Sequence, residues 1–392
     1  MPDRCRREEA VRIGVMLRTF DERGGVAVYS RNLLDTLLAI DRRNEYEVFY
    51  RTAKHRGLFS ACPNVTEHVV RACGKAHWDQ VAIPRVCRRR RVDVLLHPKF
   101  TVPLLSAVPS VMVVHGADWF LPEGATFYTP LDRMYMRLFL PLYLRKAAAV
   151  ISVSQLTTED FVRIFPYCRD KIATVYFGPA PHFRRETDPE RIAEVRRKYG
   201  LPERYILTLQ KLDGDTRKNL RGILAAWRLL HGRIDQKLVV GGLGCERFRE
   251  DYAIPGDGWG SSILFPGYLD QADLPAIYTA SDLFLYPSNL EAFPIPITEA
   301  MRCGVPIVTS RINGLAEIAG DAAVLVDPGN PVEIADAVCR VLEEPELRQQ
   351  LAARGLERAR LFSWESCARR TLEILERVGR GQSRGAPVGQ QT

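Results

Sequence analysis

The amino-acid sequence predicts an α/β protein of two domains, each with a doubly wound parallel sheet. Its 392 residues fit two domains at about 100 to 200 residues per domain. Hydrophobic residues make up 46% and charged residues 26% of the chain, proportions typical of packed globular proteins and not of disordered or fibrous ones. Short apolar runs alternate with helical patterns along the chain, as in consecutive βαβ units.

The first half of the chain contains one set of these units. An apolar strand at 12–17 leads through Gly24 and Gly25 into a helix whose apolar residues recur three and four positions apart. The predicted strands that follow are 46–50, 92–96, 110–115, 149–154 and 172–177.

The alternation begins again after a proline-rich stretch at 179–183, which we interpret as the linker between the domains. We therefore expect an N-terminal domain at 1–180 and a C-terminal domain at 181–363. Residues 379–392 lack periodicity and are expected to be disordered. The predicted strands of the second domain are 205–209, 237–240, 263–265, 283–286, 306–309 and 322–326.

Two open parallel sheets indicate where a ligand would bind. Such sheets bind ligands beyond the carboxyl ends of their strands. With two sheets joined by one linker, we expect a cleft in which these strand ends face each other. Residues that carry chemistry should then lie in loops that directly follow strands.

The net charge of +8 comes from the first half of the chain. Residues 1–180 hold 27 Lys and Arg against 18 Asp and Glu, whereas residues 181–392 hold 28 against 29. The stretch 51–100 is the most basic, with 11 against 3. It would attract an anionic partner, such as a membrane surface, a phosphorylated acceptor or nucleic acid, although a solvated Arg-rich helix explains it as well. Nucleic acid is disfavoured because no aromatic residues interleave the basic cluster of this stretch, which is Arg85, Arg88, Arg89, Arg90 and Arg91.

The chain is expected to be cytoplasmic. Its nine cysteines are scattered without a CxxC pair, which favours a reducing compartment. Residues 1–12 lack the apolar core of a signal peptide, and no apolar run reaches the roughly 18 to 20 residues that cross a bilayer. A helix at 131–146 carries basic residues beside the apolar residues Met134, Leu138, Phe139, Leu142 and Tyr143. It could lie on the inner membrane face, but a stripe that faces the core is the favoured interpretation.

Two carboxylates, Glu291 and Glu299, follow the strand at 283–286 and stand eight positions apart. The intervening prolines keep Glu291 in the loop, and Pro296 suits the first turn of a helix that carries Glu299. Ionised carboxylates accept hydrogen bonds from sugar hydroxyls, and the N-terminus of this helix suits a diphosphate. A surface loop acid and an acid in the first turn of a helix would also explain the pair.

The segments around this pair resemble a known family. From 291 to 308 the chain reads EAFPIPITEAMRCGVPIV, preceded by FPGYL at 265–269 and ASDLFLYPS at 280–288. NGLAE at 313–317 and LVDP at 325–328 follow. This pattern resembles the retaining GT-B glycosyltransferases of glycosyltransferase family 4, whose signature spaces two glutamates in the same way.

The resemblance spans residues 12–378 and implies an architecture. Two Rossmann-like domains would face a cleft, with the acceptor on the first and the nucleotide sugar on the second. The C-terminal helix at about 364–378 would cross back to the first domain.

The resemblance also implies donor-binding residues. Glu291 would contact sugar hydroxyls and Glu299 the nucleotide ribose. The basic loop 209–219 would hold the diphosphate, where fixed cations stabilise the charge of a departing nucleoside diphosphate. The glycines usual in the family's glutamate loop are replaced here by Ala292 and Pro294. The predicted donor-binding set is Lys211, Arg217, Lys218, Tyr268, Leu269, Glu291, Ala292, Phe293 and Glu299.

In the N-terminal domain the resemblance points to Gly24, Gly25 and His115. The glycines would lie against the acceptor, since a backbone without Cβ lets a ligand approach closely. His115 would contact the donor sugar, and with Glu291 and Lys218 it forms the predicted catalytic set. An ordinary tight turn and a buried structural histidine are the alternatives. The other histidines show no metal-ligand spacing, so no metal site is predicted.

The expected activity is transfer of a hexose, of mannose or glucose type, from GDP-mannose or a UDP-hexose to an acceptor hydroxyl. Retention of anomeric configuration follows from the resemblance, as does a role in cell-surface polysaccharide or glycolipid synthesis on a glycan or lipid-linked acceptor. No cofactor is expected. Two alternatives stay open, a nucleotide-sugar epimerase of the same architecture and a non-catalytic protein that binds a nucleotide sugar.

Overall fold

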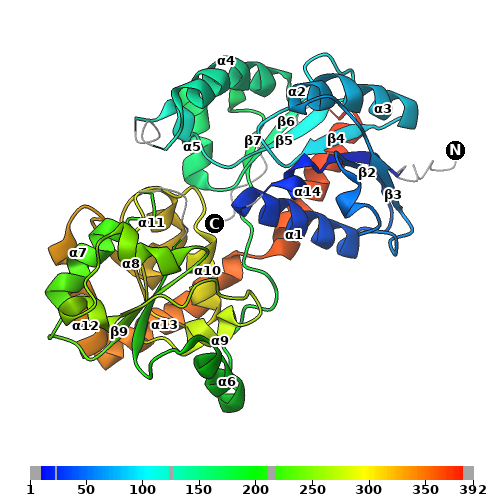
Figure 1. Cartoon of the computed structure of the whole chain (residues 1–392). Coiled ribbons are helices and arrows are strands. Elements are labelled where there is room, and N and C mark those ends of the chain that lie inside the picture. Colours follow the sequence, from blue (N-terminus) through cyan, green and yellow to red (C-terminus); the bar gives the residue numbers. More distant parts are fainter. Residues whose placement is uncertain (1–9, 23, 123–126, 211–216, 383–392) are drawn as a thin grey trace, which may run out of the picture. The chain divides into compact units, whose positions relative to one another are not determined.

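A computed structural model describes residues 10–22, 24–122, 127–210 and 217–382. The chain divides into two compact units. Unit 1 contains the described residues up to Phe177 and those from Trp364 onward, and unit 2 is Gly178–Ser363. Each unit is built on one parallel sheet (Figure 1). The predicted fold class, two α/β domains with parallel sheets and a helical C-terminus, is confirmed.

Unit 1 has a seven-stranded sheet in the order β3-β2-β1-β4-β5-β6-β7. All paired strands are parallel. The strand order reverses between β1 and β4, which makes the sheet doubly wound. The strands are β1 Arg12–Met16, β2 Glu45–Tyr50, β3 Val65–Val69, β4 Val94–His97, β5 Ser110–Val114, β6 Ala149–Ser152 and β7 Ile172–Thr174.

The edge strand β3 is absent from the strands predicted from the sequence. Its sequence, VTEHV, places three polar residues between two valines, and none of its side chains is fully buried. Strands β1, β2, β4, β5 and β6 are buried nearly throughout, whereas the other edge strand, β7, is half-buried like β3. A half-exposed edge strand therefore lacks the continuous apolar run by which the others are recognised.

The helices of unit 1 include the last helix of the chain. α14 lies against α1, so that the chain returns to unit 1 after completing unit 2 (Figure 1). Its C-terminal Gly379 comes so close to Val11 that an added Cβ would lie 2.5 Å from Val11 Cγ1. The helices are α1 Gly25–Ile40, α2 Lys75–His77, α3 Ile83–Arg90, α4 Pro130–Lys146, α5 Gln155–Ile164 and α14 Trp364–Gly379.

Helix α4 packs on the domain with a different face from the one expected. Met134, Leu138 and Leu142 are 62%, 62% and 41% exposed, so the prediction that they face the core is wrong. The other two residues of the predicted stripe do pack inward, since Tyr143 is buried and Phe139 packs partly buried against the same cluster. The helix has apolar residues on two opposite faces, and periodicity alone does not tell which of them is buried. The residues that α4 buries are Met136, Leu140, Tyr143 and Leu144.

Unit 2 has a six-stranded parallel sheet in the order β10-β9-β8-β11-β12-β13, and the order reverses between β8 and β11. Each strand predicted for this half is present, with ends that differ by at most two residues. The strands are β8 Tyr205–Leu209, β9 Lys237–Gly241, β10 Ile263–Leu264, β11 Leu283–Tyr286, β12 Ile307–Ser310 and β13 Val324–Val326.

The helices of unit 2 cover both faces of this sheet. A buried cluster that includes Ile206, Trp227 and Leu283 joins the sheet to α7 and α12. The carboxyl ends of β8 and β11 are adjacent at the switch point, so the loops that follow them meet at one edge. The helices are α6 Pro189–Tyr199, α7 Leu220–Leu230, α8 Phe248–Asp251, α9 Leu274–Thr279, α10 Ile295–Arg302, α11 Asn313–Ala319, α12 Pro331–Glu343 and α13 Pro345–Arg358.

Two further predictions concern the C-terminal tail and membrane-spanning segments. Of the tail predicted at 379–392, residues 383–392 lie outside the described residues, and Gly379 is the last residue of α14. In the described part of the chain, no helix is long and apolar enough to span a membrane.

Candidate functional site

The loops after β8 and β11 are fastened together by hydrogen bonds. The Asn289 amide donates to the Arg217 carbonyl over 2.7 Å, and Ser288 Oγ donates to the same oxygen over 2.8 Å. Asn219 Nδ2 donates to the Pro287 carbonyl over 2.9 Å. These bonds fix the backbone of two loops that lie about 70 residues apart in the sequence.

Asn219 also begins helix α7. Its φ of 56° places it in the left-handed region, which asparagine tolerates better than most residues. Its Oδ1 accepts from the Gly222 amide over 3.2 Å and caps the helix. A Cβ at Gly222 would lie 2.5 Å from this oxygen, so the cap requires glycine there. One side chain therefore both starts the helix and holds the neighbouring loop.

Lys218, Tyr286 and Glu291 form a cluster at this edge of the sheet. Lys218 Nζ lies 3.4 Å from Glu291 Oε1 and 4.7 Å from the centroid of the Tyr286 ring. It also donates a hydrogen bond to the Tyr286 hydroxyl. That hydroxyl in turn donates to Glu291 Oε1 over 2.9 Å. We call these three residues the unit 2 cluster.

Burial sets the chemical state of the unit 2 cluster. Burial raises the pKa of Tyr286 well above its ordinary value, and the nearby Glu291 acts in the same direction. The phenol is therefore neutral and remains a donor. The side chains of Lys218 and Glu291 are 20% and 16% exposed, so a ligand can reach both. The arrangement presents a cation and a carboxylate, held in place by a phenol.

Helix α11 holds the Glu291 loop from the other side. The Gly314 amide donates to the Glu291 carbonyl over 2.9 Å. A Cβ at Gly314 would lie 2.3 Å from the Ala292 carbonyl oxygen, so only glycine allows this approach. The Phe293 ring packs edge-on against Phe362 at 5.8 Å. Ala292 and Phe293, two of the predicted donor-binding residues, thus lie in a loop with a fixed backbone.

Glu299 lies on α10, in the second turn of the helix, and is buried. Tyr278 Oη donates to Glu299 Oε2 over 3.1 Å. Burial raises the pKa of Glu299 to about 7, while the Tyr278 hydrogen bond and the charge of Lys218 act to lower it. Near neutral pH this carboxyl group is therefore poised between its neutral and ionised forms.

The remaining predicted donor-binding residues of unit 2 differ in whether their side chains or only their backbone groups are accessible to a ligand. Tyr268 is 55% exposed, whereas the Leu269 side chain is buried against Gly241. Leu269 can therefore contribute only its backbone to a ligand. Arg217 contributes its carbonyl to the joined loops. Lys211 lies outside the described residues.

In unit 1, His115 directly follows β5. Its Nε2 lies 2.9 Å from the Pro98 carbonyl oxygen and must donate to it. Burial lowers the pKa of His115 to about 4, so the ring is neutral at pH 7 and its Nδ1 is an acceptor. The ring stands edge-on to Tyr29 and Phe100, at 4.9 and 5.9 Å. A fixed neutral ring fits both a structural and a ligand-binding histidine.

Gly24 and Gly25 begin helix α1. Gly24 has a φ of 111°, a conformation that favours glycine, and it precedes the first helical residue. A Cβ added at Gly25 would meet no atom within 4 Å. The fold therefore requires glycine at 24, whereas it leaves the space beside Gly25 open.

The sequence did not predict several of the residues that hold these side chains in place. Tyr286 and Tyr278 hold the two glutamates, yet neither stands next to them in the sequence. In unit 1, Arg18 pairs with Asp79 over 3.2 Å, and both are buried. Arg18 follows β1 by two residues, so a charged residue directly after an apolar strand was the available signal.

The described residues contain no group of three or more His, Cys, Asp or Glu that could hold a metal ion. All eight cysteines in the described part of the chain are free thiols.

Comparison with known proteins places these features in a family. The family model described as Glycosyl transferases group 1 matches residues 191–358, and that described as Glycosyltransferase Family 4 matches residues 23–179. The O-antigen chain mannosyltransferase B of Escherichia coli is 32% identical over 304 residues, which cover 71% of this chain and 77% of that protein.

Two solved structures share the fold. Sucrose-phosphate synthase from Thermosynechococcus elongatus matches with a TM-score of 0.76 and 20% identity, over 95% of this chain and all of that one. Anabaena Alr3699/HepE, solved in complex with UDP-glucose, matches with a TM-score of 0.72 and 18% identity, over 93% of this chain and 99% of that one.

Proposed function

The chain belongs to the group 1, family 4 glycosyltransferases, and from this premise we propose that it transfers a hexose with retention from a nucleoside-diphosphate sugar to an acceptor hydroxyl. The observation that carries the proposal is the unit 2 cluster, in which a cation and a carboxylate are held at the switch point of a doubly wound sheet. This is the place where such sheets bind nucleotides.

The diphosphate is assigned to Lys218 and the start of α7. Departure of a nucleoside diphosphate develops negative charge, and a preorganised cation stabilises that charge without reorganising in the transition state. The free amides of the helix N-terminus add to it. Arg217 and Lys211, in the same loop, are assigned to the same group.

The sugar is assigned to Glu291 and the nucleotide ribose to Glu299. Tyr286 and Lys218 both contact Glu291 Oε1, so Oε2 is the oxygen we assign to a sugar hydroxyl. Glu299 accepts from a ribose hydroxyl in its ionised form. The base is assigned to the backbone of Tyr268 and Leu269, with Ala292 and Phe293 lining the sugar loop.

In unit 1 we assign His115 to the donor sugar, through the acceptor Nδ1. Gly24 and Gly25 are assigned to the acceptor, because the space beside Gly25 is open. Charge stabilisation by side chains makes a resident metal or organic cofactor unnecessary in this proposal.

We propose GDP-mannose as the first donor to test, because the similar Escherichia coli protein is a mannosyltransferase. A UDP-hexose is the second, since a structural neighbour was solved with UDP-glucose. The acceptor is proposed to be a glycan or lipid-linked precursor of a cell-surface polysaccharide. The proposed location is the cytoplasm, with peripheral contact at the inner membrane face.

The test is release of nucleoside diphosphate from each donor by the purified protein, with and without membrane extract as a source of acceptor. We expect release that depends on the acceptor. Lys218→Ala should lower kcat by on the order of 10²-fold, the usual effect of removing one preorganised electrostatic contact.

Three results would contradict the proposal. Wild-type turnover in Lys218→Ala would remove the assignment of the unit 2 cluster. Formation of a free epimer without acceptor would indicate an epimerase. Donor binding without any turnover would indicate a non-catalytic binding protein.

A further inference from the structure

Helix α4 exposes an apolar face that has no covering element among the described residues. Leu131, Met134 and Leu138 are 69%, 62% and 62% exposed, and Tyr135 and Leu142 are 42% and 41% exposed. Their positions are spaced by three and four residues and form one stripe along the helix. The residues that α4 packs into unit 1 lie on the opposite side of the helix.

An apolar outer stripe is unusual for a surface helix. Such a helix normally turns charged and polar residues to solvent and apolar residues to the core. Single exposed apolar residues need no explanation, but a contiguous set marks a site of interaction. We therefore expect the outer face of α4 to bind an apolar partner. We call the five exposed residues the α4 stripe.

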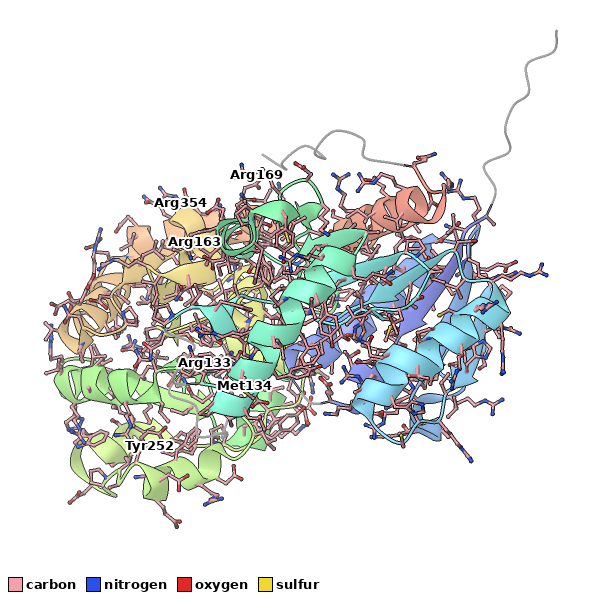
Figure 2. The ribbon with its side chains drawn as sticks, turned by 90° about the horizontal axis from the view of Figure 1, so that it is seen from above. Arg133, Met134, Arg163, Arg169, Tyr252 and Arg354 are labelled. Atoms are coloured by element: carbon pink, nitrogen blue, oxygen red, sulfur yellow. The ribbon has the colours of Figure 1, made fainter. Side chains whose placement is uncertain are left out.

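Basic side chains flank the α4 stripe. Arg137, Arg145 and Lys146 are exposed on the same helix, and Asp132 is the only acidic residue of α4. The Arg145 guanidinium lies 4.9 Å from the centroid of the Tyr167 ring, which is itself 39% exposed. Figure 2 shows α4 with Arg133 and Met134 labelled, and Arg163 and Arg169 on the segment that contains α5.

A hollow at the beginning of α4 is lined by both apolar and basic side chains. It is lined by Tyr128, Pro130, Arg133, Met134, Arg137 and Leu138. The Nε of Arg133 is buried, and in the described part of the chain it has no hydrogen-bond partner. An unsatisfied guanidinium N–H beside apolar side chains suits a ligand that carries both a phosphate and a hydrocarbon chain.

We propose that α4 docks the protein on an anionic phospholipid bilayer. The helix lies parallel to the surface, with the α4 stripe in the acyl boundary and its basic residues on the lipid phosphates. Tyr135 and Tyr167 suit the headgroup level, where amphipathic rings gather. The inference rests on the peripheral membrane contact in the proposed function and deepens it, because it names the surface and the lipid. Vesicle binding needs no nucleotide sugar, so its failure would leave the proposed sugar transfer standing.

The charge of the flanking residues favours a lipid surface over a protein partner or a second copy of the chain. A self-complementary contact would bring the Arg137, Arg145 and Lys146 groups of two copies together, and like charges oppose this. An anionic bilayer instead meets the stripe with hydrocarbon and the cations with phosphate.

The test is cosedimentation of the full-length protein with vesicles, either of phosphatidylcholine alone or with roughly a third phosphatidylglycerol, a negative surface charge like that of an inner leaflet. We expect binding to the anionic vesicles that weakens as salt is raised. Two triple variants test the two halves of the proposal, and each should lower the partition coefficient by on the order of 10- to 100-fold. The stripe variant is Leu131→Gln/Met134→Gln/Leu138→Gln, and the basic variant is Arg137→Gln/Arg145→Gln/Lys146→Gln.

Two matched control variants replace the same kinds of side chain, apolar and basic, at exposed positions outside α4. Leu105→Gln/Leu243→Gln/Val332→Gln removes apolar residues that are equally exposed outside α4, and Arg85→Gln/Arg88→Gln/Arg89→Gln removes three exposed cations of α3. Both should bind vesicles like the wild type. The altered side chains are exposed, so unchanged thermal unfolding should show that each variant is folded.

A direct readout locates the helix in the lipid. In Leu138→Trp, the new tryptophan emission should shift to the blue when anionic vesicles are added. Absence of that shift, or loss of vesicle binding in the α3 variant instead of the α4 variants, would overturn the proposal. So would a wild-type dimer that becomes monomeric in the stripe variant, since the stripe would then be a self-association surface.

Discussion

Tyr286 connects the two charged residues of the unit 2 cluster. It donates to Glu291 and accepts from Lys218, so it acts through them as a positioning residue. Tyr286→Phe keeps the ring beneath the Lys218 ammonium but removes both hydrogen bonds. We expect kcat to fall roughly 10- to 100-fold, since hydrogen bonds to charged groups contribute about 1.5 to 3 kcal/mol.

Steady-state kinetics on the donor would test the role of Tyr286. Because the ring stays, the variant should remain folded, although the lost hydrogen bonds should lower its unfolding temperature, and the loss of rate should appear in kcat more than in KM. Tyr199→Phe, which removes a hydroxyl from the end of α6, is the control and should be active. An equal loss in both variants would speak against positioning by Tyr286.

Glu299 should make the stability of unit 2 depend on pH. Its pKa is raised in the folded state to about 7 from an ordinary value of 4.5, so folding favours the protonated form. The resulting stabilisation is complete below about pH 4.5 and is lost as pH rises through 7. Its size is on the order of 3 kcal/mol.

Denaturant unfolding at pH 5, 6, 7 and 8 measures this contribution. The wild type should lose stability over that range, and Glu299→Gln, which stays neutral, should lose less. Parallel pH profiles for the two proteins would show that Glu299 does not titrate as its burial implies. Donor affinity should rise over the same pH range in the wild type alone, because a ribose hydroxyl binds the ionised carboxylate.

At the scale of elements, Asn219 should matter more than an ordinary helix cap. It caps α7 and also donates to the carbonyls of Pro287 and Pro328, both in buried contacts. Asn219→Ala removes the cap and leaves two buried carbonyls unsatisfied, so we expect a loss of about 2 to 4 kcal/mol in the free energy of unfolding.

The matched control for Asn219 is Asn330, which caps α12 with exposed hydrogen bonds and holds no second loop. Asn330→Ala should cost only about 1 kcal/mol. Chemical denaturation compares the two variants. Donor affinity should fall in Asn219→Ala only, and equal effects on stability would mean that the ties to the second loop contribute little.

The elements that could be predicted from the sequence are those whose pattern is local. Buried parallel strands show continuous apolar runs, and both sheets were found in this way. The edge strand β3 was missed because three consecutive polar residues, Thr66, Glu67 and His68, make its sequence resemble a loop. The face of α4 was misassigned because 134, 138 and 142 repeat as regularly as 136, 140 and 144. Contacts such as that of Tyr286 with Lys218 join loops that lie far apart in the sequence. The local spacing of residues cannot predict such contacts.

At the scale of the whole molecule, the two units should unfold as separable bodies, each with its own sheet. Trp364 packs against Phe177 and Tyr29 in unit 1, whereas Trp227 lies in the core of unit 2. Truncating either buried indole to alanine should cost roughly 3 to 5 kcal/mol. We expect Trp364→Ala and Trp227→Ala to lower different transitions.

Differential scanning calorimetry would follow both transitions. Trp364→Ala should also lower activity, because Tyr29 packs on both Trp364 and His115. A single transition that moves equally in both variants would show that the units unfold together, contrary to their separate cores.

The return of α14 to unit 1 has a consequence for biosynthesis. Unit 2 is one uninterrupted stretch of chain, whereas unit 1 lacks the helix that covers α1 until the ribosome has passed Gly379. Translation proceeds at about 5 to 20 residues per second, so the surface of α1 that α14 covers stays exposed for roughly 10 to 40 s while unit 2 is made. The domain translated first is thus the last to be completed, and during this interval it depends on chaperones more than its neighbour does.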